Sequence, residues 1–238
     1  MAGTIVHLTV AERLYRYITD NDLKYCFDSR LDIDEDYFIA GNICPDGIMA
    51  RNNYEREMKL HSHFRDGIPD GTFGNPGTVE LFEKRMTGFW NEHLKEEKQC
   101  PGLYLGYITH MMTDKRFILG ERNEFFKAIS VTGLTDKDRE TFVIFNAETD
   151  MVDFKLIEDI SELNNAKNSL ERVKPYEIKG LITERELTDS RKWILEHFFY
   201  SMHETSEPLY LSYDRMRKFI DDVAEEIVER LVNEGYLR

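Results

Sequence analysis

Apolar residues recur at helical spacing along most of this chain, and this pattern restricts the possible fold more than any other feature. In the stretch 212–233 the apolar positions fall on one stripe of a helix: Met216, Phe219, Ile220, Val223, Ile227, Val228 and Leu231. Gly235 follows as a stop signal. Alternating stretches, which would indicate strands, are nearly missing. The sequence therefore predicts an all-α protein.

The same spacing predicts further helices, which we place at 34–41, 78–97, 102–116, 136–165 and 188–204. Near the start of the chain, Thr9 and Glu12 have the spacing of a capping box. We therefore expect a helix to begin after Thr9 and His7 to lie just before it. We find no internal repeat or low-complexity segment, so residues 1–238 are predicted to form a single multi-helix domain.

Composition agrees with a folded protein: 41% of the residues are hydrophobic, which is enough to build a core without disulfides. Cys26, Cys44 and Cys100 are odd in number and far apart, which favours a reducing compartment. The first residues do not resemble a signal peptide, and no apolar run reaches the roughly 18 residues that span a membrane. We expect a cytoplasmic protein without stable membrane insertion. No sequence feature indicates an oligomeric state.

The net charge is −14, with 31 Lys and Arg residues against 45 Asp and Glu residues. The charges are spread along the chain, which is typical of a solvated acidic surface. Such a surface repels phosphate backbones unless metal ions or a local basic patch reverse the field. Nucleic acid is therefore not the expected partner.

His110 and Asp114 stand four residues apart in a stretch with a helical pattern. This spacing puts both side chains on one face of a helix. The helix is apolar enough to be buried on its inner face, where an unpaired Asp114 would be costly. An imidazole and a carboxylate placed in this way can hold one metal ion, and the carboxylate can also bridge two.

Further candidate ligands lie in segments with loop signals. Asp46 follows a turn that contains glycine and proline, and it is predicted to lie in a loop. His61 and His63 are two residues apart, so both would face a site from an extended segment but only one from a helix. Residues 66–77 hold four Gly and two Pro, which predicts a long surface loop near the site.

In their order and separations, these elements resemble the zinc-dependent phospholipase C family, whose fold is shared with fungal single-strand nucleases. The resemblance covers residues 1 to about 116. It rests on His7 ahead of the first helix, on the Gly-Asn-Ile-Cys-Pro-Asp turn that ends at Asp46, and on the Ser-His-Phe segment around His63. A Gly-Tyr-Ile-Thr-His helix that continues to Asp114 completes it.

The resemblance implies an all-α domain of the phospholipase C or zinc nuclease type that hydrolyses phosphoric esters with zinc. It implies a first zinc ion held by four residues: Asp46, His63, His110 and Asp114. A second ion would be held by His7 and by Asp114 as a bridging ligand. His63, as the histidine of the Ser-His-Phe segment, is the expected ligand in preference to His61.

Two departures from the family pattern limit the expected metal content. Family phospholipases complete the second site with a processed N-terminal amino group, and no comparable cleavage site precedes His7. They also hold a third zinc through a later histidine and a His-x3-Glu pair. Here no histidine lies between Asp114 and His197, and the stretch from His197 to His203 lacks that spacing. We predict one tightly held ion, a weaker second ion and no third.

Four other residues are candidates for supporting roles. Glu148 and Asp153, and also His61, could complete the second site or orient a ligand imidazole. A solvated acidic helix face is the alternative interpretation of the two carboxylates. Arg65 and Arg51 could hold a phosphate oxygen.

Nitrogen and oxygen ligands without thiolates suit Zn²⁺, with Fe or Mn as alternatives. In the enzyme hypothesis the ions activate a water, Asp46 steers it, and a phosphorus ester is cleaved. The expected substrate is a small soluble phosphoester. Phospholipid is an open alternative, although the sequence has no basic amphipathic helix that would bind an anionic bilayer.

Two other functions compete with hydrolysis. The first is a non-catalytic binding protein that is stabilised by metal at a degenerate site. The second is a phosphohydrolase of the HD type, which needs a histidine followed directly by aspartate. No histidine in this chain has an aspartate after it, which excludes that type.

Overall fold

The computed structural model describes residues 1–238, apart from the side chain of Asp70. The described residues form helices and loops without a strand, and two isolated β-bridges pair Tyr25 with Leu237 and Ile178 with Ile182. The prediction of an all-α protein is therefore confirmed. Among the described helices, none combines the length and the apolar character that crossing a bilayer requires.

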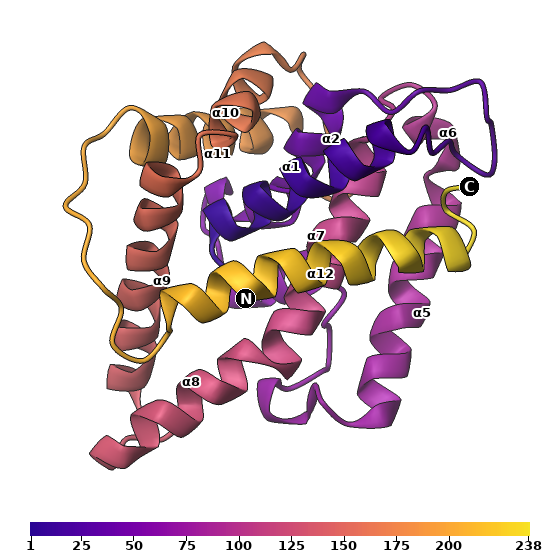
Figure 1. Cartoon of the computed structure of the whole chain (residues 1–238). Coiled ribbons are helices and arrows are strands. Elements are labelled where there is room, and N and C mark those ends of the chain that lie inside the picture. The colour runs from indigo at the N-terminus through magenta and orange to yellow at the C-terminus, as the bar shows by residue number, and fades with distance from the viewer.

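The helices lie in two halves of the chain (Figure 1). The first half contains α1 (Thr4–Asp20), α2 (Glu35–Gly41), α3 (Cys44–Gly47), α4 (Arg56–Ser62), α5 (Pro76–Glu92), α6 (Leu94–Glu97) and α7 (Leu103–Leu119). The second half contains α8 (Glu121–Ile129), α9 (Arg139–Asp159), α10 (Leu163–Arg172), α11 (Glu184–Ile194) and α12 (Tyr213–Asn233). Four short helices complete the set: η1 (Ile48–Ala50), η2 (Asp70–Thr72), η3 (Ser130–Thr132) and η4 (Leu195–Phe199).

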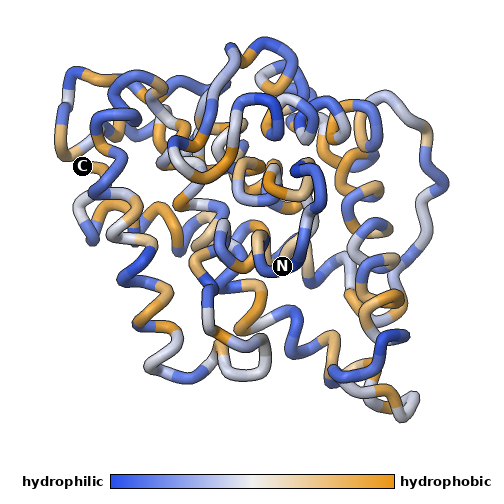
Figure 2. Tube along the Cα trace, turned by 180° about the vertical axis from the view of Figure 1, so that it is seen from behind, coloured by the Kyte–Doolittle hydropathy of each residue, from blue (hydrophilic) through white to orange (hydrophobic). Residues whose placement is uncertain are grey.

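Helix α1 occupies the centre of the fold and contacts α2, α7, α9, α10 and α12. In Figure 1 it runs beside α12, which joins the two ends of the chain in one layer. Hydrophobic and hydrophilic positions alternate along the helices with the period of a helix turn (Figure 2). The buried apolar side chains form one connected core that extends from Ala2 to Leu237.

The start of α1 differs from the prediction. The helix begins at Thr4, so His7 lies inside it and not before it. Thr9 donates its hydroxyl to the Ile5 carbonyl, and no side chain of α1 caps its N-terminus. The carboxylate of Asp153, on α9, accepts from the first turn instead. A tertiary contact thus does the work that the sequence assigned to a local capping box.

Several predicted boundaries also change. The predicted helix 136–165 is interrupted after Asp159, which separates α9 from α10. The predicted helix 188–204 begins earlier, because Thr183 and Glu186 form a true capping box, and the π-helical turn η4 ends it at Phe199. Helix α8 was not predicted. Its nine residues offer too few apolar positions to define a stripe.

Helices α2 and α7 pack closely because two glycines face each other. A Cβ atom on Gly41 would lie 2.2 Å from the Leu103 carbonyl oxygen, and one on Gly106 would lie 2.3 Å from the Phe38 carbonyl oxygen. Larger residues would push the helices apart. This contact brings the segment after α2 against the middle of α7, where the candidate ligands lie.

Candidate metal centre

His110 and Asp114 project from one face of α7, as their spacing predicts. Both are buried, and His110 Nε2 lies 3.7 Å from Asp114 Oδ2. His110 Nδ1 lies 2.7 Å from the Asn42 carbonyl oxygen, so this nitrogen carries the proton and donates it. The ring is thereby fixed with the lone pair of Nε2 directed at the cluster, which is the orientation of a metal ligand.

His63 directly follows α4 and is held in the same way. Its Nδ1 lies 2.8 Å from the Lys59 carbonyl oxygen and 3.0 Å from Ser62 Oγ. Its Nε2 lies 3.3 Å from His110 Nε2. Both histidines have Nδ1 bonded to a carbonyl oxygen, so neither Nε2 has a proton to donate to the other. A cation between the two nitrogens would resolve this contact.

Asp46 lies in the short helix α3 and not in a loop as predicted. Its Oδ1 is 3.3 Å from His63 Nε2 and 2.7 Å from Lys59 Nζ. Burial opposes the charge of this carboxylate, but the Lys59 ammonium and His63 hold the pKa of Asp46 well below its usual range. Asp46 therefore reaches the cluster as an anion.

His7 approaches the cluster from α1. Its Nε2 lies 3.3 Å from Asp114 Oδ1, and its ring stacks on the His110 ring with the centroids 3.7 Å apart. Neither ring nitrogen of His7 has a hydrogen-bond partner among the described residues, and Asp114 Oδ2 also lacks one. Buried polar atoms without partners are uncommon, and a bound ion is one of the few explanations.

The donor atoms have the spacing that a metal ion requires. In tetrahedral coordination with bonds of about 2.0–2.2 Å, neighbouring donors lie about 3.3–3.6 Å apart. Around His63 Nε2 the corresponding distances are 3.3 Å to Asp46, 3.3 Å to His110 and 3.7 Å to Asp114. These four residues fit one ion. Burial, together with His7, lowers the pKa of His110 to about 3, so its imidazole is neutral as a ligand must be.

The two oxygens of Asp114 face different partners. Oδ2 lies near His63 and His110, whereas Oδ1 lies near His7. This is the arrangement expected of a bridging carboxylate. The structure contains two ligand groups, one of His7, His110 and Asp114 and one of Asp46, His63 and His110. His110 belongs to both groups, so the two positions are not independent.

Asp153 supports the centre from a distance and is not part of either ligand group. It accepts from the backbone N–H groups of Ile5 and Val6 at 3.2 and 3.3 Å. Gly3 leaves room for it, because a Cβ atom there would lie 2.4 Å from the Asp153 carboxylate. Burial raises the pKa of Asp153 to about 8 despite these donors. Its contacts fix the first turn of α1, which carries His7.

Three other candidate residues lie outside the centre. His61 is exposed and pairs with Asp66. Glu148 accepts three backbone hydrogen bonds from residues 209–211, so it anchors the segment before α12. Arg51 binds Glu186 on α11. These side chains are engaged elsewhere, and none of them lines the space next to the centre.

The centre opens into a cavity of about 460 Å³, to which His63 contributes the link. Four cationic side chains line this cavity, Arg56, Lys59, Arg65 and Arg122, and its lining contains no described carboxylate. The Met1 amino group is also there, and burial lowers its pKa to about 6. Of the two predicted phosphate-binding arginines, the structure brings Arg65 to this cavity. Lys59 and Arg122 were not predicted.

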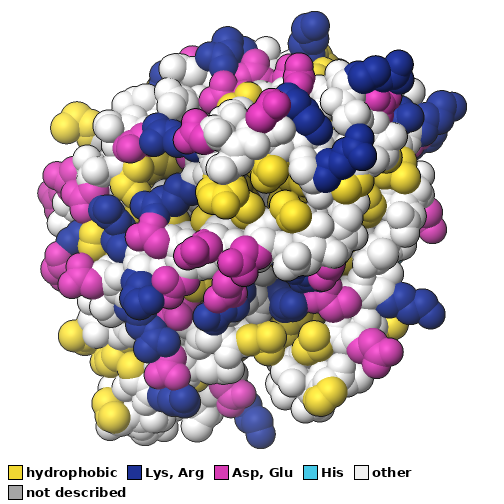
Figure 3. Space-filling view, turned by 45° about the vertical axis from the view of Figure 1, so that its right-hand side comes forward, with side chains coloured by type: hydrophobic (Ala, Val, Ile, Leu, Met, Phe, Trp, Pro, Cys, Tyr) yellow, Lys and Arg dark blue, Asp and Glu magenta, His cyan; other side chains and the backbone are white. Residues whose placement is uncertain are grey.

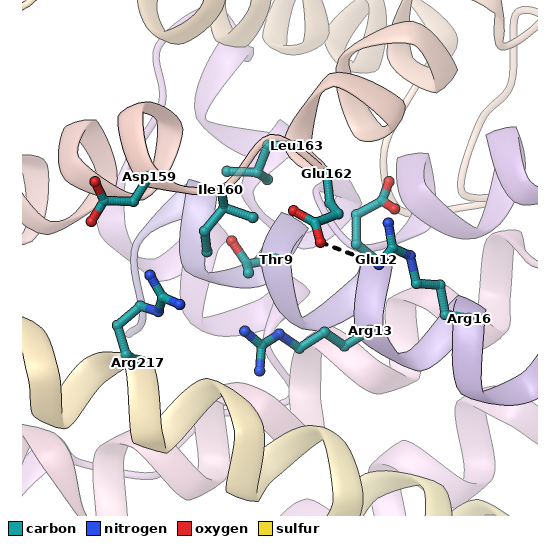
Figure 4. Close-up of a pocket in the computed structure, with 9 residues that line it drawn as sticks. All are labelled: Thr9, Glu12, Arg13, Arg16, Asp159, Ile160, Glu162, Leu163 and Arg217. Carbon is teal, nitrogen blue, oxygen red and sulfur yellow. Dashed lines mark hydrogen bonds and ion pairs between the residues drawn. The ribbon is translucent and has the colours of Figure 1, made fainter.

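A second cavity, of about 300 Å³, lies between α1, α12 and the start of α10. The guanidinium groups of Arg13 and Arg217 point toward each other across it, and Arg16 pairs with Glu162 (Figure 4). Glu12 and Asp159 also line it. Arginines and carboxylates therefore alternate around this cavity, and no group of metal-ligand type is found there among the described residues.

The described residues contain no third group of potential ligands. His197 and His203 lie together at the end of η4, where the ring of His203 stacks on Phe154. His203 Nε2 lies next to the His197 carbonyl oxygen. These histidines are part of an aromatic cluster far from α7 in sequence.

Comparisons with known proteins do not extend this picture: no family model, no curated protein and no solved structure matches the chain. The interpretation of the centre therefore rests on its own geometry.

Proposed function

We propose that this protein is a metal-dependent hydrolase of phosphoric esters, with zinc as the expected ion. The observation that carries the proposal is a convergence. A cluster of buried imidazoles and carboxylates with metal-ligand spacing opens into a cavity whose charged side chains are cationic. The net charge of the chain is −14, so this lining runs against its overall balance. A phosphate group fits such a place.

The residues have distinct roles in this proposal. His63, His110, Asp46 and Asp114 would hold the first ion, and His7 with the second oxygen of Asp114 would hold the other. A bound ion would supply Lewis acidity, which lowers the pKa of a water and offsets charge that develops on phosphate. Asp46 would orient the attacking water. Lys59 lies 2.7 Å from Asp46 and would bind a phosphate oxygen beside it.

Arg65 and Arg122 would complete the phosphate site. The Arg65 guanidinium lies 4.8 Å from the centre of the Phe73 ring, and that of Arg122 lies 5.2 Å from the Phe126 ring. Aromatic faces hold guanidinium groups in a fixed plane and leave their edges able to donate. A small soluble phosphoester remains the expected substrate. A reducing compartment stays part of the proposal and is supported by three free cysteines.

The test is a comparison of wild type with Asp114→Asn after purification without chelators. We expect the wild type to contain metal and to hydrolyse 4-nitrophenyl phosphate or bis(4-nitrophenyl) phosphate, and the variant to lose both properties. Metal content and stability without hydrolysis of any phosphoester would instead support the non-catalytic, metal-stabilised alternative. Hydrolysis that persists after complete metal removal would contradict both.

A further inference from the structure

The cavity beside the metal centre has two kinds of wall, and together they restrict the substrate. We propose that the substrate is a phosphate monoester, carrying two negative charges at neutral pH, whose alcohol bears a flat apolar ring. This inference rests on the proposed function, since it concerns the same site. It goes further by naming the charge of the phosphate group and the shape of the group attached to it.

The charge follows from the cationic wall. Arg56, Lys59, Arg65 and Arg122 line the cavity without a described carboxylate among the lining residues. Lys59 and Arg122 both act on the amino group of Met1, which places these two cations around one point close to Asp46 and Asp114. Coulomb attraction scales with the product of the charges, so a dianion gains about twice as much here as a monoanion. Monoesters are dianions, whereas diesters carry one charge.

The apolar ring follows from the remaining lining residues. Phe142 and Phe145 come from α9, and Met49, Tyr54 and Leu60 come from the region around α4. Phe142 is half-buried, so part of its ring faces the cavity. Aromatic and long apolar side chains bind a flat ring by stacking and by burying its surface. A polar alcohol such as glycerol would leave this wall without a partner.

A diester fits the same cavity poorly. Its second substituent would have to lie among the cationic side chains, because the apolar wall is taken by the first. Removing water from arginine and lysine without a hydrogen-bonding partner is costly. The second cavity shows the contrast, since its arginines face Glu162, Asp159 and Glu12 and need no ligand for charge balance.

The experiment measures binding and not turnover, so it is independent of whether hydrolysis occurs. Three non-hydrolysable probes are titrated calorimetrically into the metal-loaded full chain. Phenylphosphonate is a dianion with a ring, ethylphosphonate is a dianion without a ring, and methyl phenylphosphonate is a monoanion with a ring. We expect phenylphosphonate to bind about tenfold more tightly than either of the others, since each lacks one interaction.

Two variants assign these preferences to the two walls. Phe142→Ala should weaken phenylphosphonate about tenfold and leave ethylphosphonate unchanged, with exposed Val143→Ala on the same helix as the control. Arg122→Gln should weaken both dianions and bring them closer to the monoanion. Lys127→Gln, which removes the same charge from an exposed position of α8, should not.

The outcomes separate this inference from the proposed function. Equal affinity for the three probes, or a ring preference that Phe142→Ala leaves intact, would overturn the substrate assignment even if phosphoesters are hydrolysed. Tight and selective binding of phenylphosphonate that responds to both variants supports the assignment even where turnover is absent. In that case only the catalytic proposal would fail.

Discussion

Helix α1 borders two cavities that contain similar residue types and differ in how the charges are arranged. Toward α7 it contributes His7 to a cluster in which buried nitrogen and oxygen atoms lack partners. Toward α10 and α12 it contributes Arg13 and Arg16, which pair with Asp221 and Glu162. On the surface, acidic and basic side chains are likewise intermixed (Figure 3). The comparison teaches that a ligand site is marked by charges and donors left uncompensated, and not by their number.

The comparison breaks most clearly if the metal centre tolerates loss of its bridging residue. Asp114→Ala should empty both metal positions, because the two oxygens of Asp114 face both ligand groups. The free energy of unfolding should fall by about 3–5 kcal/mol, since buried ligands are left crowded and unpaired. Metal analysis and a thermal unfolding curve measure the two effects. A variant that keeps its metal would show that the site is built from other residues.

A smaller but more selective effect distinguishes the two histidines of α4 and the residue after it. His63→Ala should remove the first ion, because His63 Nε2 lies within 3.7 Å of donors from three other candidate ligands. His61→Ala is the matched control, since His61 is exposed and pairs only with Asp66 among the described carboxylates. Metal content decides the matter. Equal loss in both variants, or loss in His61→Ala alone, would refute the assignment.

His7→Ala should have an intermediate effect on metal content. His7 approaches only the Oδ1 atom of Asp114, so the first ion should stay and the second should weaken. A titration of the metal-free protein with zinc would then show one class of sites where the wild type shows two. If the first ion is lost as well, His7 belongs to the first site, and the division of ligands between the two positions is wrong.

The smallest effect on metal is expected in the second cavity, where Glu12 provides a stability test. Burial, with Glu35 nearby, raises the pKa of Glu12 from 4.5 to about 7. Its stabilising contribution is therefore complete below pH 4.5 and is lost as the pH rises through about 7. Arg16, Asn165 and Glu162 also face this carboxyl.

Glu12→Gln removes this titration. We expect the variant to gain stability relative to wild type between pH 5 and pH 8, by on the order of 2 kcal/mol in the free energy of unfolding. Denaturant titrations at the two pH values measure the change, and metal content should stay the same at both. A parallel loss of metal would show that the two cavities are coupled, whereas a difference that is constant with pH would exclude the titration of Glu12.

The ligands on α7 were predictable because their relation is local. His110 and Asp114 are one helical turn apart, so periodicity alone places them together. Asp46 and His63 joined them only through the resemblance, because no local rule joins α3 and α4 to α7. The structure supplies the missing step in Gly41 and Gly106, which let α2 and α7 approach.

The supporting residues were harder to predict because they act across long separations. Lys59 and Arg122 are 63 positions apart and meet only when α4 and α8 have packed. Asp153 had the residue type of a ligand, but the packing of α9 against α1 directs it to a helix N-terminus. Sequence patterns report faces of helices, whereas these roles depend on which helices become neighbours.

The central claim is that the buried cluster on α7 holds metal, and metal analysis of the full chain purified without chelators tests it most directly. We expect one ion per chain that survives dialysis, a second that is lost more easily, and zinc as the main element. Removing the ions should lower the thermal unfolding temperature, and adding zinc back should restore it. A folded protein that contains no metal and is not stabilised by zinc would contradict the claim, and three ions at full occupancy would contradict the assignment of ligands.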